Sequence, residues 1–329
     1  MITMTLKRSF IFLLLITGLK LFPQDSALVN PAKPENYFRF AYDNDFFSAT
    51  DRYYTQGIML DLIHPVIKHS PFSYALIRLN KTALNYYGFH LEQDVFTPVS
   101  IRYMGGAIYY GERPFTAVFF ASHSLTSLDP VKKTLLKTQL DLGIIGPNAK
   151  GEEEQKGIHK ALDNIEPLGW DNQLAQDIVI NYRATFEKGF INTEHFELMG
   201  SVTARLGTLY TDAGLGLNLR AGIFSGYFNN LGLENNPAAR KNKFKIYIFA
   251  RANARAVGYN ATLQGGLINK SSVYTLPAGD IRRFVAEARG GIVVAYKRLG
   301  LEYSRAYITP EFARGVDHGW GRVAVNVCF

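Results

Sequence analysis

The chain has 329 residues, a formal net charge of +8 and one cysteine, Cys328, so a disulfide framework is excluded. Aromatic residues make up 13% of the chain and 29 glycines are spread along it. After residue 24 no apolar run is long enough to cross a membrane as a helix, and the basic charge favours an anionic partner.

Residues 1–24 are typical of a secretory signal peptide, and residues 25–329 then form the mature domain. Lys7 and Arg8 precede an apolar run at residues 9–19, which is shorter than the ~20 residues of a transmembrane helix. Cleavage removes three basic residues and no acidic ones, leaving 33 basic and 28 acidic residues and a charge of +5. For an exported chain of this charge, a lipid head group or phosphate is a better-fitting partner than nucleic acid.

Alternation of apolar and polar residues recurs along the mature chain and predicts β-strands. Between Ile178 and Glu187 the even positions are apolar, while the odd positions include Asn181 and Arg183. Segments of this kind reach the ~10 residues that a tilted strand needs to cross a bilayer. The predicted strands cover residues 37–43, 56–63, 84–96, 115–124, 134–144, 177–188, 195–206, 212–223, 243–257, 282–297, 299–309 and 320–329.

These twelve segments predict an all-β fold, a 12-stranded antiparallel transmembrane β-barrel. An even number of strands closes a barrel with both termini on the periplasmic side. The last segment ends on Phe329, which resembles the terminal strand of bacterial outer-membrane proteins. A soluble β-sandwich is the alternative, but it gives little reason for arginine and glutamate at so many inward positions.

The expected topology places the connections after the odd-numbered strands on the extracellular side. The longest of these span residues 145–176 and 258–281, and the first contains a predicted short helix at residues 151–163. Gln155 and His159 are four residues apart and therefore share one face of that helix.

His159 is the candidate general base, and the alternative is a solvated loop histidine. His318 is a weaker candidate on the same side. The chain lacks a Gly-x-Ser-x-Gly elbow, so a histidine without a serine or cysteine partner indicates water as the nucleophile.

Asn44 and Asp45 lie in an oxygen-rich segment that offers the ligands calcium prefers, although a short acidic loop is often only solvated. The segment is not an EF-hand, because Ser48 and Tyr54 occupy the positions of that loop's glycine and glutamate. The sequence therefore predicts Ca²⁺ as a cofactor, with Asn44 and Asp45 as its ligands.

The chain resembles the lipid A 3'-O-deacylase family of outer-membrane barrels, the LpxR type. The resemblance covers nearly all of the mature chain and rests on Asn44-Asp45, Tyr54-Thr55-x-Gly57, Gln93-Asp94-x-Phe96-x-Pro98, Gly111-Glu112-Arg113, Asp141-x-Gly143-x-x-Gly146-Pro147, Gln155-x-x-x-His159, Trp170-x-x-Gln173 and Thr262-Leu263-Gln264-Gly265. It implies a twelve-stranded barrel that uses calcium to hydrolyse the acyloxyacyl ester at the 3' position of lipid A.

The resemblance also implies roles for individual residues. His159 would activate water and Gln155 would orient the histidine or the substrate. Asn44, Asp45 and Thr55 would surround the metal and the scissile carbonyl. The family's lysine-arginine pair after the proline of strand 3 has no aligned pair here.

Two arginines are therefore expected to anchor a lipid A phosphate instead, namely Arg102 and Arg113. The alternative is that both are solvated, or pair with Glu112 or Asp94.

The sequence thus predicts a monomeric lipid A deacylase of the outer membrane, in contact with its lipids and with its active site facing outward. One alternative is an outer-membrane phospholipase or other acyl esterase of the same fold. The other is a small porin or adhesion barrel that releases no fatty acid.

Overall fold

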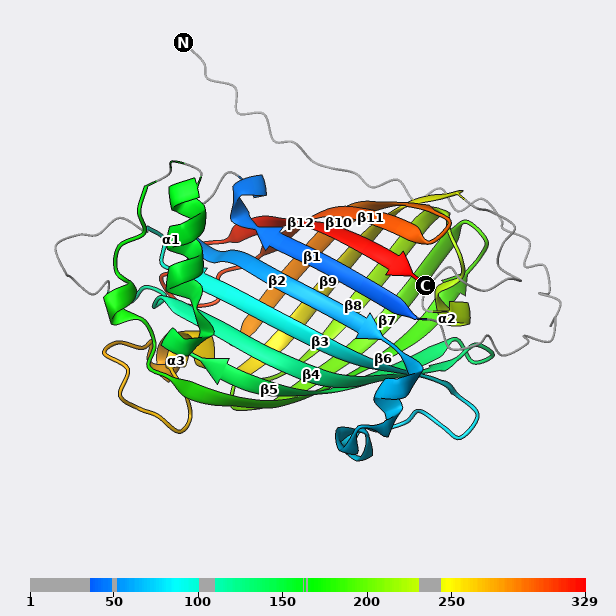
Figure 1. Ribbon diagram of the computed structural model, residues 1–329, viewed down its shortest axis with the longest axis horizontal. Helices are drawn as coiled ribbons and strands as arrows, with labels where there is room; N and C mark the ends of the chain where they lie inside the picture. Colours follow the sequence, from blue (N-terminus) through cyan, green and yellow to red (C-terminus); the bar gives the residue numbers. More distant parts are fainter. Residues whose placement is uncertain (1–35, 49–51, 101–109, 162, 164, 231–243) are drawn as a thin grey trace, which may run out of the picture. The chain divides into compact units, whose positions relative to one another are not determined.

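A computed structural model describes residues 36–48, 52–100, 110–161, 163, 165–230 and 244–329. The predicted signal peptide and Arg102 lie outside the described residues. Twelve antiparallel strands form a closed barrel in which each strand pairs with its neighbours in sequence and β1 pairs with β12 (Figure 1). The predicted fold class is confirmed.

The strands are β1 (Tyr37–Asn44), β2 (Tyr53–Ile63), β3 (Leu84–Thr97), β4 (Thr116–Asp129), β5 (Thr134–Ile145), β6 (Asp177–Asn192), β7 (Phe196–Gly207), β8 (Tyr210–Ile223), β9 (Phe244–Asn260), β10 (Phe284–Tyr296), β11 (Leu299–Ile308) and β12 (His318–Cys328). The helices are α1 (Gly151–Ala161), α2 (Tyr227–Asn230) and α3 (Ala261–Gln264). Short 3-10 helices include η1 (Asp45–Ser48), η2 (Pro65–His69), η3 (Pro71–Ala75), η4 (Pro147–Ala149), η5 (Trp170–Asn172) and η7 (Ala278–Asp280).

The predicted strands differ from the observed ones mainly in where they begin and end. β4 continues to Asp129 and β6 to Asn192, because their pairing extends to the turns between strands. β2 starts at Tyr53, three residues before the prediction, because a β-bulge near Thr55 interrupts its alternation. α1 ends at Ala161, so the predicted helix in the loop after β5 is confirmed in a slightly shorter form.

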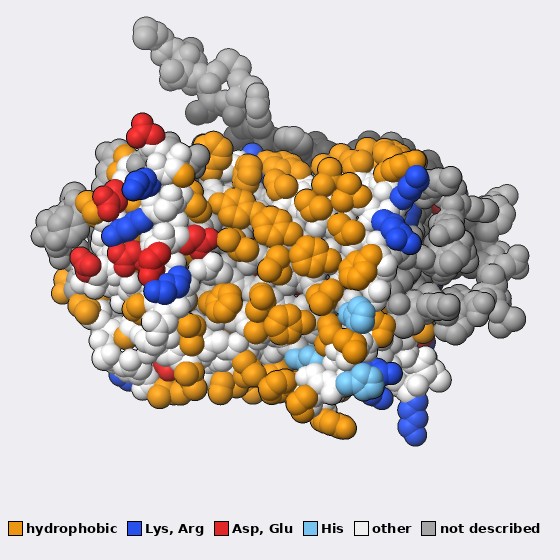
Figure 2. Space-filling model, in the orientation of Figure 1, with side chains coloured by type: hydrophobic (Ala, Val, Ile, Leu, Met, Phe, Trp, Pro, Cys, Tyr) orange, Lys and Arg blue, Asp and Glu red, His pale blue; other side chains and the backbone are white. Residues whose placement is uncertain are grey.

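The alternation read from the sequence separates the exterior of the barrel from its lumen. On β6, Ile178 and Ile180 are 47% and 48% exposed, whereas Asn181 is 1% exposed. Figure 2 shows hydrophobic side chains across the middle of the exterior and charged side chains gathered around α1. An apolar band of this kind is what a bilayer-spanning barrel presents to lipid.

None of the helices in the described part of the chain is both long and apolar enough to span a membrane.

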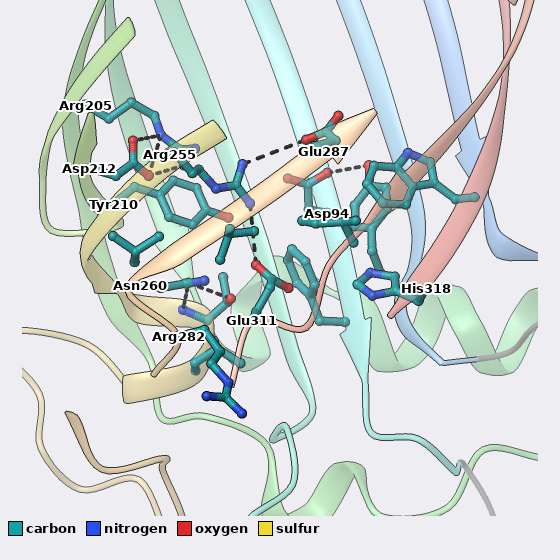
Figure 3. Close-up of a pocket in the computed structure, with 18 of the residues that line it drawn as sticks. Asp94, Arg205, Tyr210, Asp212, Arg255, Asn260, Arg282, Glu287, Glu311 and His318 are labelled. Atoms are coloured by element: carbon teal, nitrogen blue, oxygen red, sulfur yellow. Dashed lines mark hydrogen bonds and ion pairs between the residues drawn. The ribbon is translucent and has the colours of Figure 1, made fainter. Parts of the chain in front are cut away.

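The lumen contains many charged side chains that form ion pairs with one another. The Asp43 carboxylate on β1 binds the Arg322 guanidinium on β12, with an Oδ1–Nε distance of 2.5 Å. Figure 3 shows Arg255 between Glu287 and Glu311, at 3.8 and 3.6 Å.

Cavities of 340 and 540 Å³ lie in this lumen, and Arg183, Arg289 and Arg322 line both. The two cavities therefore meet at a layer of arginines.

The two ends of the barrel carry different structures, and the site depends on one of them. β1 begins and β12 finishes at one end, here called the C-terminal end, where η2, η3 and α2 also lie. The opposite end, here called the α1 end, carries η1, α1 and α3 (Figure 1). All of the described site residues predicted from the sequence lie at the α1 end.

Candidate active site

Asn44 faces the exterior of the barrel. In the closed sheet it lies opposite Gln56 on β2 and Gly321 on β12. Its neighbour Asp43 faces the lumen, where it binds Arg322. Because successive side chains of a strand point to opposite faces, Asn44 and Gln56 lie on the outside of the wall.

A β-bulge in β2 brings Thr55 to the same region. The register shifts between Tyr54 and Gln56, which leaves Thr55 as the inserted residue. Tyr54 points into the lumen, where its hydroxyl donates to Asp94 Oδ1 at 3.0 Å. Gln56 faces outward, and both it and Thr55 are at most 4% exposed, so something covers this part of the exterior.

The cover is α1, which begins on the exterior of β3 and β4. Val95 and Ala117 continue the row that contains Asn44 and Gln56. A Cβ added to Gly151 would lie 2.5 Å from the Ala117 Cβ atom and 3.4 Å from Val95 Cγ1. Only glycine lets the first turn of the helix approach the wall this closely.

From this start the helix runs towards β1, where the charge of Glu154 acts on Tyr42. Glu154 already lies beside Gln56 of β2. His159 is eight residues beyond Gly151, which is about 12 Å along an α-helix. Three strand spacings separate β4 from β1, which is about 14 Å. Figure 1 shows α1 standing across the strand ends. A helix of this length is long enough to carry His159 towards the β1 side of the covered wall.

The hydrogen bond of His159 defines its tautomer. Nδ1 lies 2.6 Å from the backbone carbonyl oxygen of Ile165. A carbonyl oxygen can only accept, so Nδ1 carries a proton and donates it; the tautomer with this arrangement has its lone pair on Nε2. The ring is 8% exposed. An oriented imidazole of this tautomer presents Nε2 as the proton acceptor that a general base requires.

Gln155 holds α1 in place through a tryptophan from the following loop. The indole Nε1 of Trp170 donates to Gln155 Oε1 at 2.9 Å, and Phe115 packs against the indole with ring centroids 5.0 Å apart. Trp170 is 1% exposed. The spacing in the sequence predicts Gln155 beside His159. In the structure the amide oxygen of Gln155 accepts from Trp170 and so attaches the helix to the following loop.

The oxygen atoms beneath α1 are ligands of the kind that hard cations prefer. Asn44 Oδ1 accepts from the Phe46 amide and Asp45 Oδ2 accepts from the Arg52 amide, both at 2.8 Å, which orients the two side chains. Burial raises the pKa of Glu154 to about 7, and the Gln56 side chain partly offsets this shift. One carboxylate oxygen of Glu154 is buried without a hydrogen-bond partner in the described chain.

These donors fit Ca²⁺ by their chemistry, because oxygen atoms from carboxylates, amides and hydroxyls are its usual ligands. Within the described ranges, no three His, Cys, Asp or Glu side chains cluster in a way that could hold a metal. A calcium site here would therefore combine Asp45 and Glu154 with neutral oxygens from Asn44 and Thr55. Glu154 and Gln56 were not predicted as site residues, because only the folding of α1 over β2 brings them together.

Arg113 lies in the lumen and not beside the site. Its guanidinium is 2.6 Å from Glu311, donates to Thr262 Oγ1 at 3.2 Å and lies over the Phe96 ring. With 1% exposure it has no free face for a phosphate, which argues against the predicted anchoring role. From the sequence, Glu112 and Asp94 were the alternative ion-pair partners of Arg113. In the structure its partner is Glu311.

His318, the other candidate base, is also directed into the barrel. It is 4% exposed, lines the 340 Å³ cavity and packs its ring against Tyr53 and Trp320. His159 and His318 therefore lie on opposite sides of the wall.

A closed barrel with an apolar exterior and a covered polar site defines a membrane β-barrel protein with a candidate active site on its outer surface. The chain belongs to the family described as outer membrane protein LpxR, whose model matches residues 10–329.

Among solved structures, LpxR from Salmonella typhimurium matches with a TM-score of 0.72 and 21% identity, covering 89% of this chain and 100% of that chain. The β domain of the Bordetella autotransporter BrkA matches with a TM-score of 0.46 and 12% identity, covering 90% of this chain and 100% of that chain. A search of curated proteins found no match.

Replacing Trp170 should loosen α1 without opening the barrel. Trp170→Phe removes the indole N–H, so Gln155 Oε1 loses its donor inside a buried contact. The expected loss of about 1–3 kcal/mol would lower hydrogen-exchange protection of the α1 amides roughly tenfold. The matched control is Trp320→Phe, because the N–H of Trp320 binds Asp43 in the lumen. Unchanged α1 protection in Trp170→Phe would contradict this account of how the helix is held.

Proposed function

We propose that the protein is a calcium-dependent hydrolase that removes the 3'-linked acyloxyacyl chain of lipid A. The observation that supports the proposal is the orientation of His159, whose Nδ1 is held by the Ile165 carbonyl oxygen. The helix that carries His159 also places Glu154 beside Gln56, the cross-strand neighbour of Asn44. The family resemblance read from the sequence points to the same reaction.

The reaction would use water as its nucleophile. His159 Nε2 would take a proton from water while the hydroxide oxygen attacks the ester carbonyl carbon. The carbonyl bond would re-form as the bond to the sugar oxygen breaks, and the protonated imidazole would return its proton to that oxygen. The products are a free fatty acid and a sugar hydroxyl, so no other reactant is required.

Asn44, Asp45, Thr55 and Glu154 would hold the calcium ion. When bound, Ca²⁺ would supply positive charge next to the carbonyl oxygen, where negative charge develops during the attack. The chain's own residues would orient the ester and keep out bulk solvent beyond the attacking water, since Asp45, Thr55 and Gln56 are almost fully covered.

The exterior position of the site suits a lipid substrate. A lipid A molecule could approach sideways in the membrane, without its acyl chains entering the charged lumen. The α1 end would face outward from the cell, because lipid A in an outer membrane occupies the outer leaflet. The barrel closes on itself through β1 and β12 and leaves no unpaired strand edge, which supports a monomer.

A phospholipase or other acyl esterase of the same fold is the second candidate, because the same base and oxygen donors would serve any ester at this surface. A porin is disfavoured by the luminal ion pairs. Glu311, in the segment after β11, binds Arg113, in the segment before β4, and Arg255 of β9, so these side chains occupy the space through which a solute would pass.

Mass spectrometry of lipid A from cells with and without this protein tests the proposal. The wild-type chain should produce lipid A that lacks the 3'-linked acyl chains. His159→Ala should lower the rate about 10²-fold or more, because it removes the general base. His195→Ala is the control, since His195 is exposed at the C-terminal end. Unchanged lipid A, with released phospholipid fatty acid, would favour the second candidate.

Calcium should be required for this reaction. Chelation of the purified enzyme is expected to stop deacylation, and added Ca²⁺ is expected to restore it, because the donors under α1 are oxygen atoms. Asp45→Asn removes one negative charge from the set and should raise the calcium concentration needed for half-maximal rate. A wild-type rate in excess chelator would exclude the metal.

A further inference from the structure

The exterior of the described strands carries few charges. By the register of the sheet, Asp129 and Lys188 face outward at the C-terminal end. Asp129 accepts from backbone amides of the neighbouring turn, and Lys188 donates to the Lys132 carbonyl oxygen. Away from those turns, Arg305 on β11 is the charged side chain that the described strands direct outward.

Arg305 is exposed and has no polar partner among the described residues. It lies opposite Gly290 on β10 and Gly321 on β12, so no side chain flanks it on either neighbouring strand. Ser304 and Ala306, beside it in sequence, are buried, which confirms that Arg305 points away from the lumen. The nearby carboxylate of Asp317 is engaged by the Tyr307 hydroxyl and has Arg52 and His318 as its charged neighbours.

The position of Arg305 relates it directly to the candidate site. Gly321 pairs with Arg305 on one side and with Asn44 on the other. Two strand spacings, about 10 Å, therefore separate the backbones of Arg305 and Asn44 on the same face. Phe47 of η1 packs over Gly321 between them.

We propose that Arg305 binds a phosphate group of the lipid A molecule whose ester lies at Asn44 and His159. This proposal rests on the proposed function.

Arg305 lies three residues before the α1 end of β11, about 10 Å along the strand, within reach of the head-group layer. A charged side chain on a lipid-facing wall is unfavourable unless it reaches an opposite charge. A guanidinium can hold a phosphate through two parallel hydrogen bonds. The 3' and 4' carbons of one sugar ring are adjacent, so a 4'-phosphate held by Arg305 would keep the 3' ester near Asn44.

Binding measured without turnover tests this directly. His159→Ala protein would be titrated with bisphosphorylated lipid A and with lipid A lacking the 4'-phosphate. Adding Arg305→Gln should weaken binding of the bisphosphorylated lipid about tenfold or more and leave the other lipid unchanged. Arg305→Lys should lose less, because it keeps the charge but not the paired donors.

The control is Arg298→Gln, which removes an exposed arginine at the C-terminal end and should change neither affinity. The proposal is overturned if the two lipids bind with equal affinity both before and after Arg305→Gln. It is also overturned if Arg305→Gln weakens the binding of both lipids equally. Inorganic phosphate should compete poorly, and competition as strong as that of the lipid would overturn the assignment to a membrane lipid. Because no hydrolysis is measured, these outcomes are separate from a failure of the deacylase proposal.

Discussion

Closure of the sheet between β1 and β12 is the constraint on which the rest of the structure depends. Once this pairing is set, every residue in a strand is committed either to the lumen or to the exterior. The commitment separates neighbours in sequence that have opposite chemistry. Asp43 enters an ion pair inside the barrel, while Asn44, the next residue, faces the surface beneath α1.

The luminal and exterior faces of the sheet consequently carry different kinds of side chain. The luminal charges pair with one another along the inner wall, and Arg322, Arg289 and Arg255 each lie within ion-pair distance of a carboxylate. Such pairs satisfy many of the luminal charges, and buried apolar side chains such as Phe96, Val118 and Phe120 pack beside them. The exterior needs few polar groups to meet lipid, so the oxygen donors under α1 and the guanidinium of Arg305 stand out there as groups that the fold itself does not require.

Local sequence patterns predicted much of this arrangement. Alternation along single strands was enough to obtain the number of strands and their approximate limits, and the spacing of Gln155 and His159 correctly placed both on one helix. The strand ends were less accurate, because the bulge at Thr55 breaks the alternation that defines β2.

Features that depend on long-range register were not predictable in this way. Arg113 was predicted to belong to the site because its loop and the loops of the site residues lie at the same end of the barrel. Its guanidinium turns inward to Glu311, almost two hundred residues away in the chain. Glu154 lies beside Gln56 only because α1 folds back over the wall, and Arg305 lies in the row of Asn44 only because the barrel closes. These relations join residues far apart in the chain, and no local spacing encodes them.

The central claim is that the substrate lipid reaches the protein on its exterior beside η1 and not through the lumen. Site-specific photocrosslinking in living cells tests it most directly, with a photoreactive phenylalanine analogue at one of two positions. Phe46 is 78% exposed beside Asn44, whereas Asn253 lines the 540 Å³ luminal cavity. Approach from the exterior should give a lipopolysaccharide adduct at position 46 and none at position 253; an adduct at position 253 with none at position 46 would show that the lipid enters through the lumen.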